Sequence, residues 1–214
     1  MTLTVALYWS FRSPYSYLAT GRLVDLANTW DLDVAVHVVS PIAIRDPAFF
    51  ERVDPLMPSY VVRDSHRVAE HAGIPFRWPQ PDPVVMDMRT RAIAAEQPYI
   101  HRLNRLGVAA TEMGRGLAYL DEVSRVIWTG DVDNWQEGEH LARAARRAGL
   151  DPAALEAAAG EHLDAVLVTN EAELTAAGHW GVPTLVFNGE PFFGQDRLDL
   201  LLWRLQQSGL EKRA

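Results

Sequence analysis

The sequence of 214 residues contains no cysteine. A chain without cysteine has no disulfide, no thiolate nucleophile and no thiolate ligand for a metal. Any sulfur chemistry at this protein must therefore use the sulfur of a bound small molecule. Histidine offers no metal site in its place, because His66 and His71 lack the i, i+4 spacing of a helical ligand pair. No cluster of histidines and carboxylates stands out elsewhere, so we expect no metal centre.

The sequence also lacks an apolar run long enough to span a bilayer, and it lacks the basic start and apolar stretch of a signal peptide. We therefore expect a cytoplasmic protein. The net charge of −8 argues against binding to nucleic acid or to anionic membranes, because both attract basic surfaces. A small anionic ligand in a local basic pocket remains compatible with that charge. With 48% hydrophobic and 22% charged residues, the chain has the composition of an ordinary globular protein.

The most informative pattern lies near the N-terminus. Residues 5–9 form an apolar run typical of a short buried strand, and helical spacing follows over residues 14–29. Ser13 is a preferred N-cap residue and Pro14 suits the first helical position. The unpaired N–H groups and the dipole of such a helix start favour an anion. Ser13 is thus either a cap alone or also a functional hydroxyl, whereas we interpret Ser16 as structural.

Further strands are predicted at both ends of the chain. The valine-rich residues 33–39 indicate a strand covered on both faces, which completes a parallel βαβ unit. Near the C-terminus, Asn188-Gly189 separates two short apolar runs and is a strong signal for a type I′ hairpin. Pro191 places the second strand of that hairpin at an edge of the sheet. A closing amphipathic helix follows.

The chain between these ends is mainly helical in pattern. Proline-rich residues 41–58 and 74–87 predict loops and short turns. Helices are predicted over residues 59–72, 99–128 with a break at Gly107 or at Gly114 and Gly116, 139–148, from 151, and 161–177. Parallel strands need neighbours and a lone hairpin is marginal, so one sheet should combine both ends. We predict a domain from residues 1–40 and 179–214, with a helical insertion subdomain over residues 41–178.

The resulting order, βαβ…ββα with a helical insertion between the second and third strands, resembles the α/β thioredoxin-like fold in its DsbA-like branch. Ser-Pro-Tyr-Ser at residues 13–16 stands where such proteins have Cys-Pro-Tyr-Cys. Gly-Val-Pro-Thr at 181–184 matches their cis-proline loop, which implies a cis bond before Pro183. Ser-Pro-Tyr-Ser-Tyr-Leu at 13–18 and Gly-Gln-Asp-Arg-Leu at 194–198 resemble 2-hydroxychromene-2-carboxylate isomerases and kappa-class glutathione transferases. The resemblance covers both ends well and the middle only in outline.

This resemblance implies a glutathione site with assigned roles. The Ser13 hydroxyl would face the sulfur of glutathione, and Val182 would pair through its backbone with the cysteinyl part. Asp196 would meet the γ-glutamyl ammonium. Gln195, Arg197 or the adjacent helix N-terminus would take the γ-glutamyl carboxylate, because N–H donors and arginine favour carboxylates.

The chain departs from the family after the second strand, where relatives commonly carry a lysine or asparagine. Here the proline-rich loop offers Ser40, Arg45 and Asp46 instead. Arg45 could replace a lysine as the partner of an anion. Phe11 and Arg12, which flank the start of the helix, are further candidates for substrate contact. Arginines are surface charges by default, however, and Phe11 either lines an aromatic pocket or belongs to the core.

The resemblance implies a glutathione-dependent isomerase that acts on a small aromatic or otherwise conjugated carboxylate. A kappa-class-like transferase would use the same activated thiol, and a DsbA-like fold that lost its cysteines could serve as a binding module. A disulfide oxidoreductase is disfavoured because the chain has no cysteine of its own. Relatives of the isomerase kind are dimers, so we expect a homodimer with no nucleic-acid or membrane partner.

Overall fold

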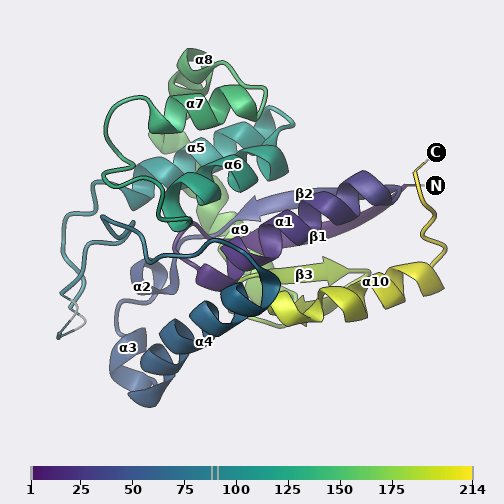
Figure 1. The fold of residues 1–214 in the computed structure, drawn as a ribbon, viewed down its shortest axis with the longest axis horizontal. Helices are drawn as coiled ribbons and strands as arrows, with labels where there is room; N and C mark the ends of the chain where they lie inside the picture. The colour runs from purple at the N-terminus through teal and green to yellow at the C-terminus, as the bar shows by residue number, and fades with distance from the viewer. Residues whose placement is uncertain (1, 88, 91, 214) are drawn as a thin grey trace.

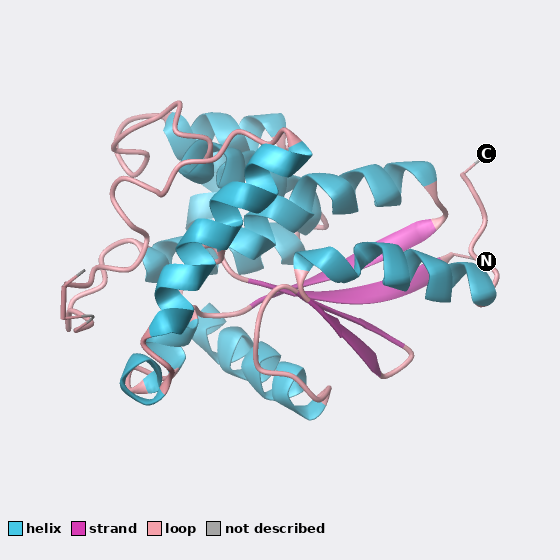
Figure 2. Cartoon of the chain, turned by 60° about the horizontal axis from the view of Figure 1, so that its bottom comes forward, coloured by secondary structure: helices cyan, strands magenta, loops and turns pink. Residues whose placement is uncertain are grey.

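A computed structural model describes residues 2–87, 89–90 and 92–213. Its centre is a four-stranded sheet in the order β2-β1-β3-β4, which combines both ends of the chain as predicted. The parallel pair β1 (Leu3–Trp9) and β2 (Leu32–Val38) begins in register at Leu3 opposite Leu32. The strands β3 (Thr184–Phe187) and β4 (Glu190–Phe193) run antiparallel to β1 and to each other. Helices lie on both sides of this sheet (Figure 2).

Three local predictions about the strands can be compared with the structure. The hairpin turn has positive φ at both central residues, 50° at Asn188 and 79° at Gly189, as a type I′ turn requires. Pro191 lies in β4, an edge strand. The strand β2 was predicted to be covered on both faces; it is the other edge strand, several helices pack on it, and of its residues only Asp33 is exposed. Its many valines reflect helices packed on it and not a central place in the sheet.

The helix α1 (Pro14–Thr29) has the predicted limits, and its start has a clear physical cause. The Ser13 hydroxyl accepts a hydrogen bond from the Ser16 N–H at 3.1 Å, and Pro14 occupies the first helical position. The indole of Trp9 donates to the Thr20 hydroxyl at 2.9 Å, which fastens the first turns of α1 to β1. The strand and the helix therefore hold the intervening turn from both sides.

The chain between β2 and β3 forms the helical insertion. Figure 1 shows α5 to α8 gathered at the top and α3 and α4 at the lower left. Residues 41–58 were predicted as loop and turns and contain two one-turn helices, while the next helix begins before its predicted start at residue 59 because prolines fit a first turn. The predicted break falls at Gly114 and Gly116 and not at Gly107. The elements are α2 (Ile42–Arg45), α3 (Phe49–Arg52), α4 (Leu56–Ala72), α5 (Ile100–Glu112), α6 (Gly116–Trp128), α7 (His140–Arg147), α8 (Pro152–Ala158), the 3₁₀ helix η1 (Glu161–Leu163) and α9 (Asp164–Ala176). After β4 come the 3₁₀ helix η2 (Gln195–Arg197) and α10 (Leu198–Gln207).

One hydrophobic cluster joins the sheet to the insertion. The ring of Phe11 meets Trp9 edge to face with centroids 4.8 Å apart, and the indole of Trp128 donates to the Phe11 carbonyl at 3.0 Å. Helix α5 approaches this point closely, because a Cβ at Gly107 would lie 2.8 Å from the Phe11 ring. The predicted division into a domain and an insertion subdomain stays a prediction, since both share this core.

The close approach at Gly107 predicts a stability difference between two helical glycines. Gly107→Ala forces its methyl into the rings of the core and should destabilise the protein by about 1–3 kcal/mol. Gly21→Ala in α1 meets nothing within 4 Å and should stabilise it by about 0.5–1 kcal/mol, since alanine is the better helix former. Chemical denaturation of both variants measures this. Equal effects of the two substitutions would contradict the packing at Gly107.

Candidate active site

The candidate site lies at the edge of the sheet where the parallel strands β1 and β2 end. Open α/β sheets bind ligands beyond the carboxyl ends of their strands. Because β3 is antiparallel, its N-terminal end reaches the same edge, and with it the loop at residues 181–183. The start of α1 follows directly after β1. The topology thus joins two segments that are far apart in the sequence.

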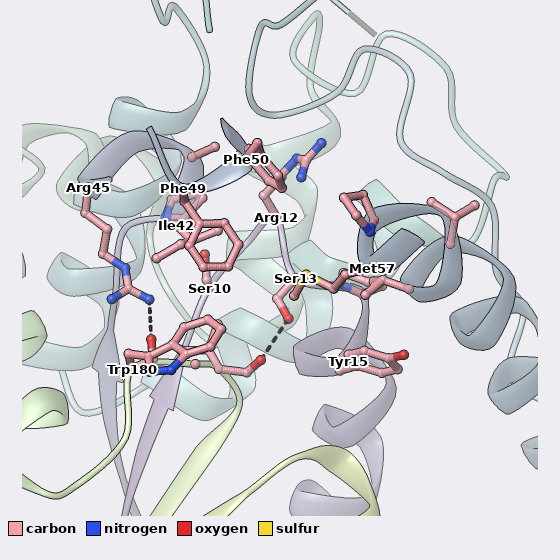
Figure 3. Close-up of a pocket in the computed structure, with 18 of the residues that line it drawn as sticks. Ser10, Arg12, Ser13, Tyr15, Ile42, Arg45, Phe49, Phe50, Met57 and Trp180 are labelled. Atoms are coloured by element: carbon pink, nitrogen blue, oxygen red, sulfur yellow. Dashed lines mark hydrogen bonds between the residues drawn. The ribbon is translucent and has the colours of Figure 1, made fainter. Parts of the chain in front are cut away.

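Ser13 lies where these segments meet. Its hydroxyl donates to the carbonyl of Val182 at 3.3 Å while it accepts from the Ser16 N–H. The Ser13 hydroxyl therefore caps the helix as an acceptor and still has its own O–H available as a donor. The first of the two predicted halves of the site faces the second (Figure 3).

The loop before β3 is fixed from several directions. The bond between Val182 and Pro183 is cis, as predicted. The Thr184 hydroxyl donates to the Gly181 carbonyl at 2.7 Å, and Gly194 N–H donates to the Pro183 carbonyl at 2.9 Å. A Cβ at Gly181 would lie 2.5 Å from the ring of Phe193, so a larger residue there would force this ring to shift. Within the described part of the chain, the Val182 N–H has no acceptor.

A cavity of about 250 Å³ opens beside Ser13. Its walls come from the turn after β1, from α2, α3 and α4, and from the loop before β3, and they are mostly aliphatic and aromatic. Figure 3 shows Phe49, Phe50 and Trp180 around this space. The apolar part of the wall consists of Pro14, Pro41, Ile42, Ala43, Phe49, Phe50, Met57, Pro58, Val61, Val62, Trp78, Met86, Trp180, Gly181, Val182 and Phe193. The polar or charged remainder is Ser10, Arg12, Ser13, Tyr15 and Arg45.

Arg12 reaches the cavity wall, but its charge is already matched. Its guanidinium pairs with both oxygens of Asp82, at 3.1 and 2.9 Å, and lies 5.4 Å from the centre of the Trp78 ring. The two side chains are only 14% and 16% exposed. A substrate carboxylate at Arg12 would compete with Asp82, so the geometry gives Arg12 a structural role in the wall.

Arg45 differs from Arg12 because its hydrogen bonds go to uncharged groups. Its Nε donates to the Ser40 carbonyl at 3.0 Å, and one of its terminal nitrogens donates to the Trp180 carbonyl at 2.5 Å. Burial lowers the pKa of this guanidinium, because the charged form loses hydration. Among the described residues, no carboxylate forms an ion pair with Arg45. An anion that enters the cavity could bind the partly desolvated guanidinium of Arg45 through N–H groups that make no other hydrogen bond to the described part of the chain.

Three of the residues predicted to bind glutathione lie outside the cavity wall. Gln195, Asp196 and Arg197 form η2, beside the first half of α1. The Gln195 carbonyl accepts from Arg22 at 3.1 Å. Asp196 and Arg197 pair with each other at 2.7 Å and are both exposed. They are available to a ligand that extends out of the cavity along the loop before β3.

Phe11 was predicted to contact substrate, and the structure corrects this. The side chain is fully buried between Trp9 and α5 and takes no part in the cavity wall. The aromatic wall is supplied by Phe49, Trp180 and Phe193 instead. They were missed because they come from three separate short segments, α3, the loop before β3 and the end of β4, which only the tertiary fold brings together. A pair of adjacent phenylalanines in a proline-rich loop was the available signal.

Two broader features complete the description. No helix in the described part of the chain is long and apolar enough to cross a membrane. The same residues contain no group of three or more histidine or carboxylate side chains arranged to hold a metal ion.

Comparison with known proteins places the chain by its fold. A family model described as DSBA-like thioredoxin domain matches residues 4–206. The chain belongs to the DSBA-like thioredoxin domain family. A search of curated protein sequences finds no match.

Solved structures agree with this family. A structure of 2-hydroxychromene-2-carboxylate isomerase is 22% identical and superposes with a TM-score of 0.72, covering 96% of this chain and 95% of that one. A probable DsbA oxidoreductase from Streptomyces coelicolor is 18% identical with a TM-score of 0.64, covering 96% and 89%. The cytosolic disulfide reductase DsbM from Pseudomonas aeruginosa, solved with GSH, is 18% identical with a TM-score of 0.59, covering 95% and 100%. At these identities the likeness shows the fold.

The loop before β3 also predicts a pH dependence of stability. His179 stacks on Phe193 with centroids 3.9 Å apart, and its Nδ1 accepts the Gly181 N–H at 2.8 Å. Burial lowers the pKa of His179 below its ordinary 6.5. The unfolded chain then binds a proton more readily, so the stability from neutral His179 is complete above pH 6.5 and is lost as pH falls toward the folded pKa.

Replacing His179 by Gln should therefore flatten the loss of stability just below pH 6.5. Unfolding midpoints in denaturant, measured across that range for both proteins, provide the comparison. A wild-type protein whose stability falls no faster than that of His179→Gln would refute the lowered pKa that burial gives His179.

Proposed function

We propose that this protein is a glutathione-dependent isomerase of small aromatic or conjugated carboxylates. The observation that carries the proposal is the Ser13 hydroxyl, held at a helix start against the Val182 carbonyl, beside an apolar cavity, in a chain with no cysteine. This arrangement can hold and activate a thiol but cannot supply one. A relative by fold is named an isomerase, and another was solved with GSH, which supports the choice.

The residues present suit the cysteinyl part of glutathione. The Val182 N–H has no acceptor among the described residues, and its carbonyl is engaged only by Ser13 at the long distance of 3.3 Å. A peptide-like ligand can donate to that carbonyl and accept from that N–H. The Ser13 hydroxyl would then be released from Val182 and could donate to a sulfur instead. The cap bond from Ser16 does not have to break, because it uses a lone pair of the same oxygen.

When bound, glutathione supplies the thiolate that adds to the substrate and leaves it again unchanged. Ser13 lowers the pKa of that thiol by donating a hydrogen bond to the anion, and the N-terminus of α1 adds its positive potential. The apolar wall excludes water and strengthens both effects. Outside the cavity, Asp196 and Arg197 would separate from each other to meet the ammonium and carboxylate of the γ-glutamyl end, with Gln195 beside them.

The cavity limits the substrate in size and charge. Its volume of about 250 Å³ lies below the common range for ligand pockets, so a compound with a single ring fits better than a fused system. We assign the substrate carboxylate to Arg45, which carries a charge without an ion-pair partner among the described residues. Arg12 is excluded from that task by Asp82.

The compartment and the assembly are part of the same proposal. Glutathione maintains reduced thiols in the cytosol, and one relative by fold is named a cytosolic reductase. We therefore propose a cytoplasmic enzyme, and a homodimer as the family resemblance implies. Consumption of glutathione in the assay below would identify a transferase in place of an isomerase.

Substitutions of Ser13 test the activation of the thiol. Ser13→Ala should lower kcat for glutathione-dependent isomerisation roughly 10²-fold or more, as loss of one donor does at other sites. The variant also loses the helix cap, at a cost of about 1 kcal/mol. Ser13→Asp is the matched control, because aspartate caps the helix but donates no hydrogen bond to a thiolate.

Both variants should show a raised pKa of bound glutathione, measured from the ultraviolet absorbance of the thiolate, and only Ser13→Ala should be less stable. Full activity in Ser13→Asp would contradict the proposed role of the Ser13 hydroxyl.

Comparison of a charged and a neutral substrate tests whether Arg45 binds the substrate carboxylate. Arg45→Met should lower kcat/KM for the anionic enone benzylidenepyruvate by roughly 10- to 100-fold, the value of a hydrogen bond to a charged group. The neutral enone benzylideneacetone should lose much less. An equal loss for both compounds would show that Arg45 acts only by holding the Trp180 carbonyl.

A further inference from the structure

Ser10 is a second hydroxyl at the floor of the cavity, and the predicted site does not include it. It follows the last residue of β1, and its carbonyl accepts from the Ser13 N–H at 3.2 Å. The residue is 1% exposed and lines the cavity. Figure 3 shows its hydroxyl pointing up toward Phe49 and Ile42, on the side of the cavity opposite α4.

The Ser10 hydroxyl makes no hydrogen bond with any described residue. Burying a hydroxyl without a partner costs roughly 1–3 kcal/mol, so each such group in a folded protein calls for an explanation. Two other buried hydroxyls in the protein are satisfied: Thr20 donates to the Ser16 carbonyl and Thr184 to the Gly181 carbonyl. The unpaired state of Ser10 is therefore a property of its position.

Ser16 provides an internal comparison. Its hydroxyl is equally buried and equally without a partner among the described residues. It lies within the first turn of α1, however, and does not contribute to the cavity wall. Of the two, only Ser10 can reach a ligand in the cavity.

The surroundings of Ser10 indicate which ligand atom it would meet. The neighbouring wall is apolar, and the anion-binding role belongs to Arg45 at the Trp180 side. A neutral hydroxyl in such a setting suits a neutral acceptor that gains negative charge during the reaction. The carbonyl oxygen of a conjugated system is such an acceptor, because addition of a thiolate to the alkene carbon moves electron density onto that oxygen.

We propose that Ser10 is a catalytic residue that donates a hydrogen bond to the carbonyl oxygen of the conjugated substrate. This inference rests on the proposed function and adds a second donor to it: Ser13 serves the sulfur and Ser10 serves the oxygen. As the carbon–sulfur bond forms, the electron pair of the alkene shifts toward the carbonyl and the oxygen becomes negative. The former double bond can then rotate. As the carbon–sulfur bond breaks, the pair returns, and no proton or electron is gained or lost overall.

The test compares wild type, Ser10→Ala and Ser16→Ala, with cis-benzylideneacetone and reduced glutathione as the probe. This enone is neutral, so its turnover should depend much less on Arg45 than that of a carboxylate. Ser10→Ala should lower kcat/KM for conversion to the trans isomer by about 10²-fold, while the affinity for glutathione stays unchanged. Ser16→Ala should remain within about threefold of wild type, because a lost unpaired hydroxyl costs little. Wild-type turnover that survives in Ser10→Ala would overturn the role of Ser10 and leave the proposed function standing.

A binding measurement decides the matter independently of turnover. Calorimetry compares trans-benzylideneacetone with the hydrocarbon in which a methylene group replaces its carbonyl oxygen. The wild-type protein should bind the enone more tightly than it binds the hydrocarbon. The Ser10→Ala variant should bind both compounds with similar affinity. Wild type without glutathione-dependent turnover but with the preference would refute the proposed function and keep the Ser10 contact. Absence of the preference in wild type, or failure to bind the enone, would overturn the contact.

Stability separates this role from a structural one. Removal of a buried, unsatisfied hydroxyl should leave the melting temperature of Ser10→Ala unchanged or raised. A melting temperature clearly below that of Ser16→Ala would mean that Ser10 has a partner within the fold, which would contradict the proposal.

Discussion

The contact between the Ser13 hydroxyl and the Val182 carbonyl is the constraint around which this site is built. It spans 169 positions of sequence and joins the start of α1 to the loop before β3. Further contacts fix both partners. Ser13 caps α1 and precedes Pro14, and the Thr184 hydroxyl donates a hydrogen bond within the loop. A ligand with peptide-like groups can replace this contact without disturbing either support. The site is thus rigid in its frame and exchangeable at one hydrogen bond.

The two arginines in the cavity wall differ in the groups that they contact. Arg12 and Arg45 both line an apolar space, but Asp82 neutralises the first while the second meets only carbonyl groups. The charges of Glu171 and Asp46 offset part of the desolvation of Arg45 without an ion pair, and a ligand carboxylate in direct contact would relieve more of that cost. The asymmetry between the two arginines therefore carries more information about the ligand than their shared presence in the wall.

Sequence patterns predicted correctly those parts of the structure that neighbouring residues determine. A capping serine with proline after it defined the start of α1, and Asn188-Gly189 defined the hairpin. The cis bond before Pro183 came from family resemblance and not from composition. The assignment of Phe11 failed because its burial depends on α5, which packs on it through Gly107 from a distant part of the sequence.

The apolar wall of the cavity could not be predicted for a related reason. Phe49 begins the one-turn helix α3 and Trp180 lies in the loop before β3; their rings meet with centroids 5.3 Å apart, and no periodicity links them. Periodic patterns report which face of a regular element is buried, whereas loop residues acquire neighbours only from the tertiary fold. Sequence patterns did not indicate Ser10 either, because the lack of a hydrogen-bond partner for its hydroxyl depends on the tertiary structure.

The absence of cysteine connects these features. In a fold whose relatives by structure include disulfide reductases, serine at position 13 keeps the helix start and its potential but removes the covalent reactivity. What remains at this position is a hydroxyl at the start of a helix, and at Ser10 a hydroxyl enclosed in mostly apolar surroundings. Two hydroxyls separated by one turn of chain can stabilise charge at two different atoms of a reacting pair. Such a site would suit the proposed isomerisation, in which charge moves to the substrate oxygen and returns and the thiol is left unchanged.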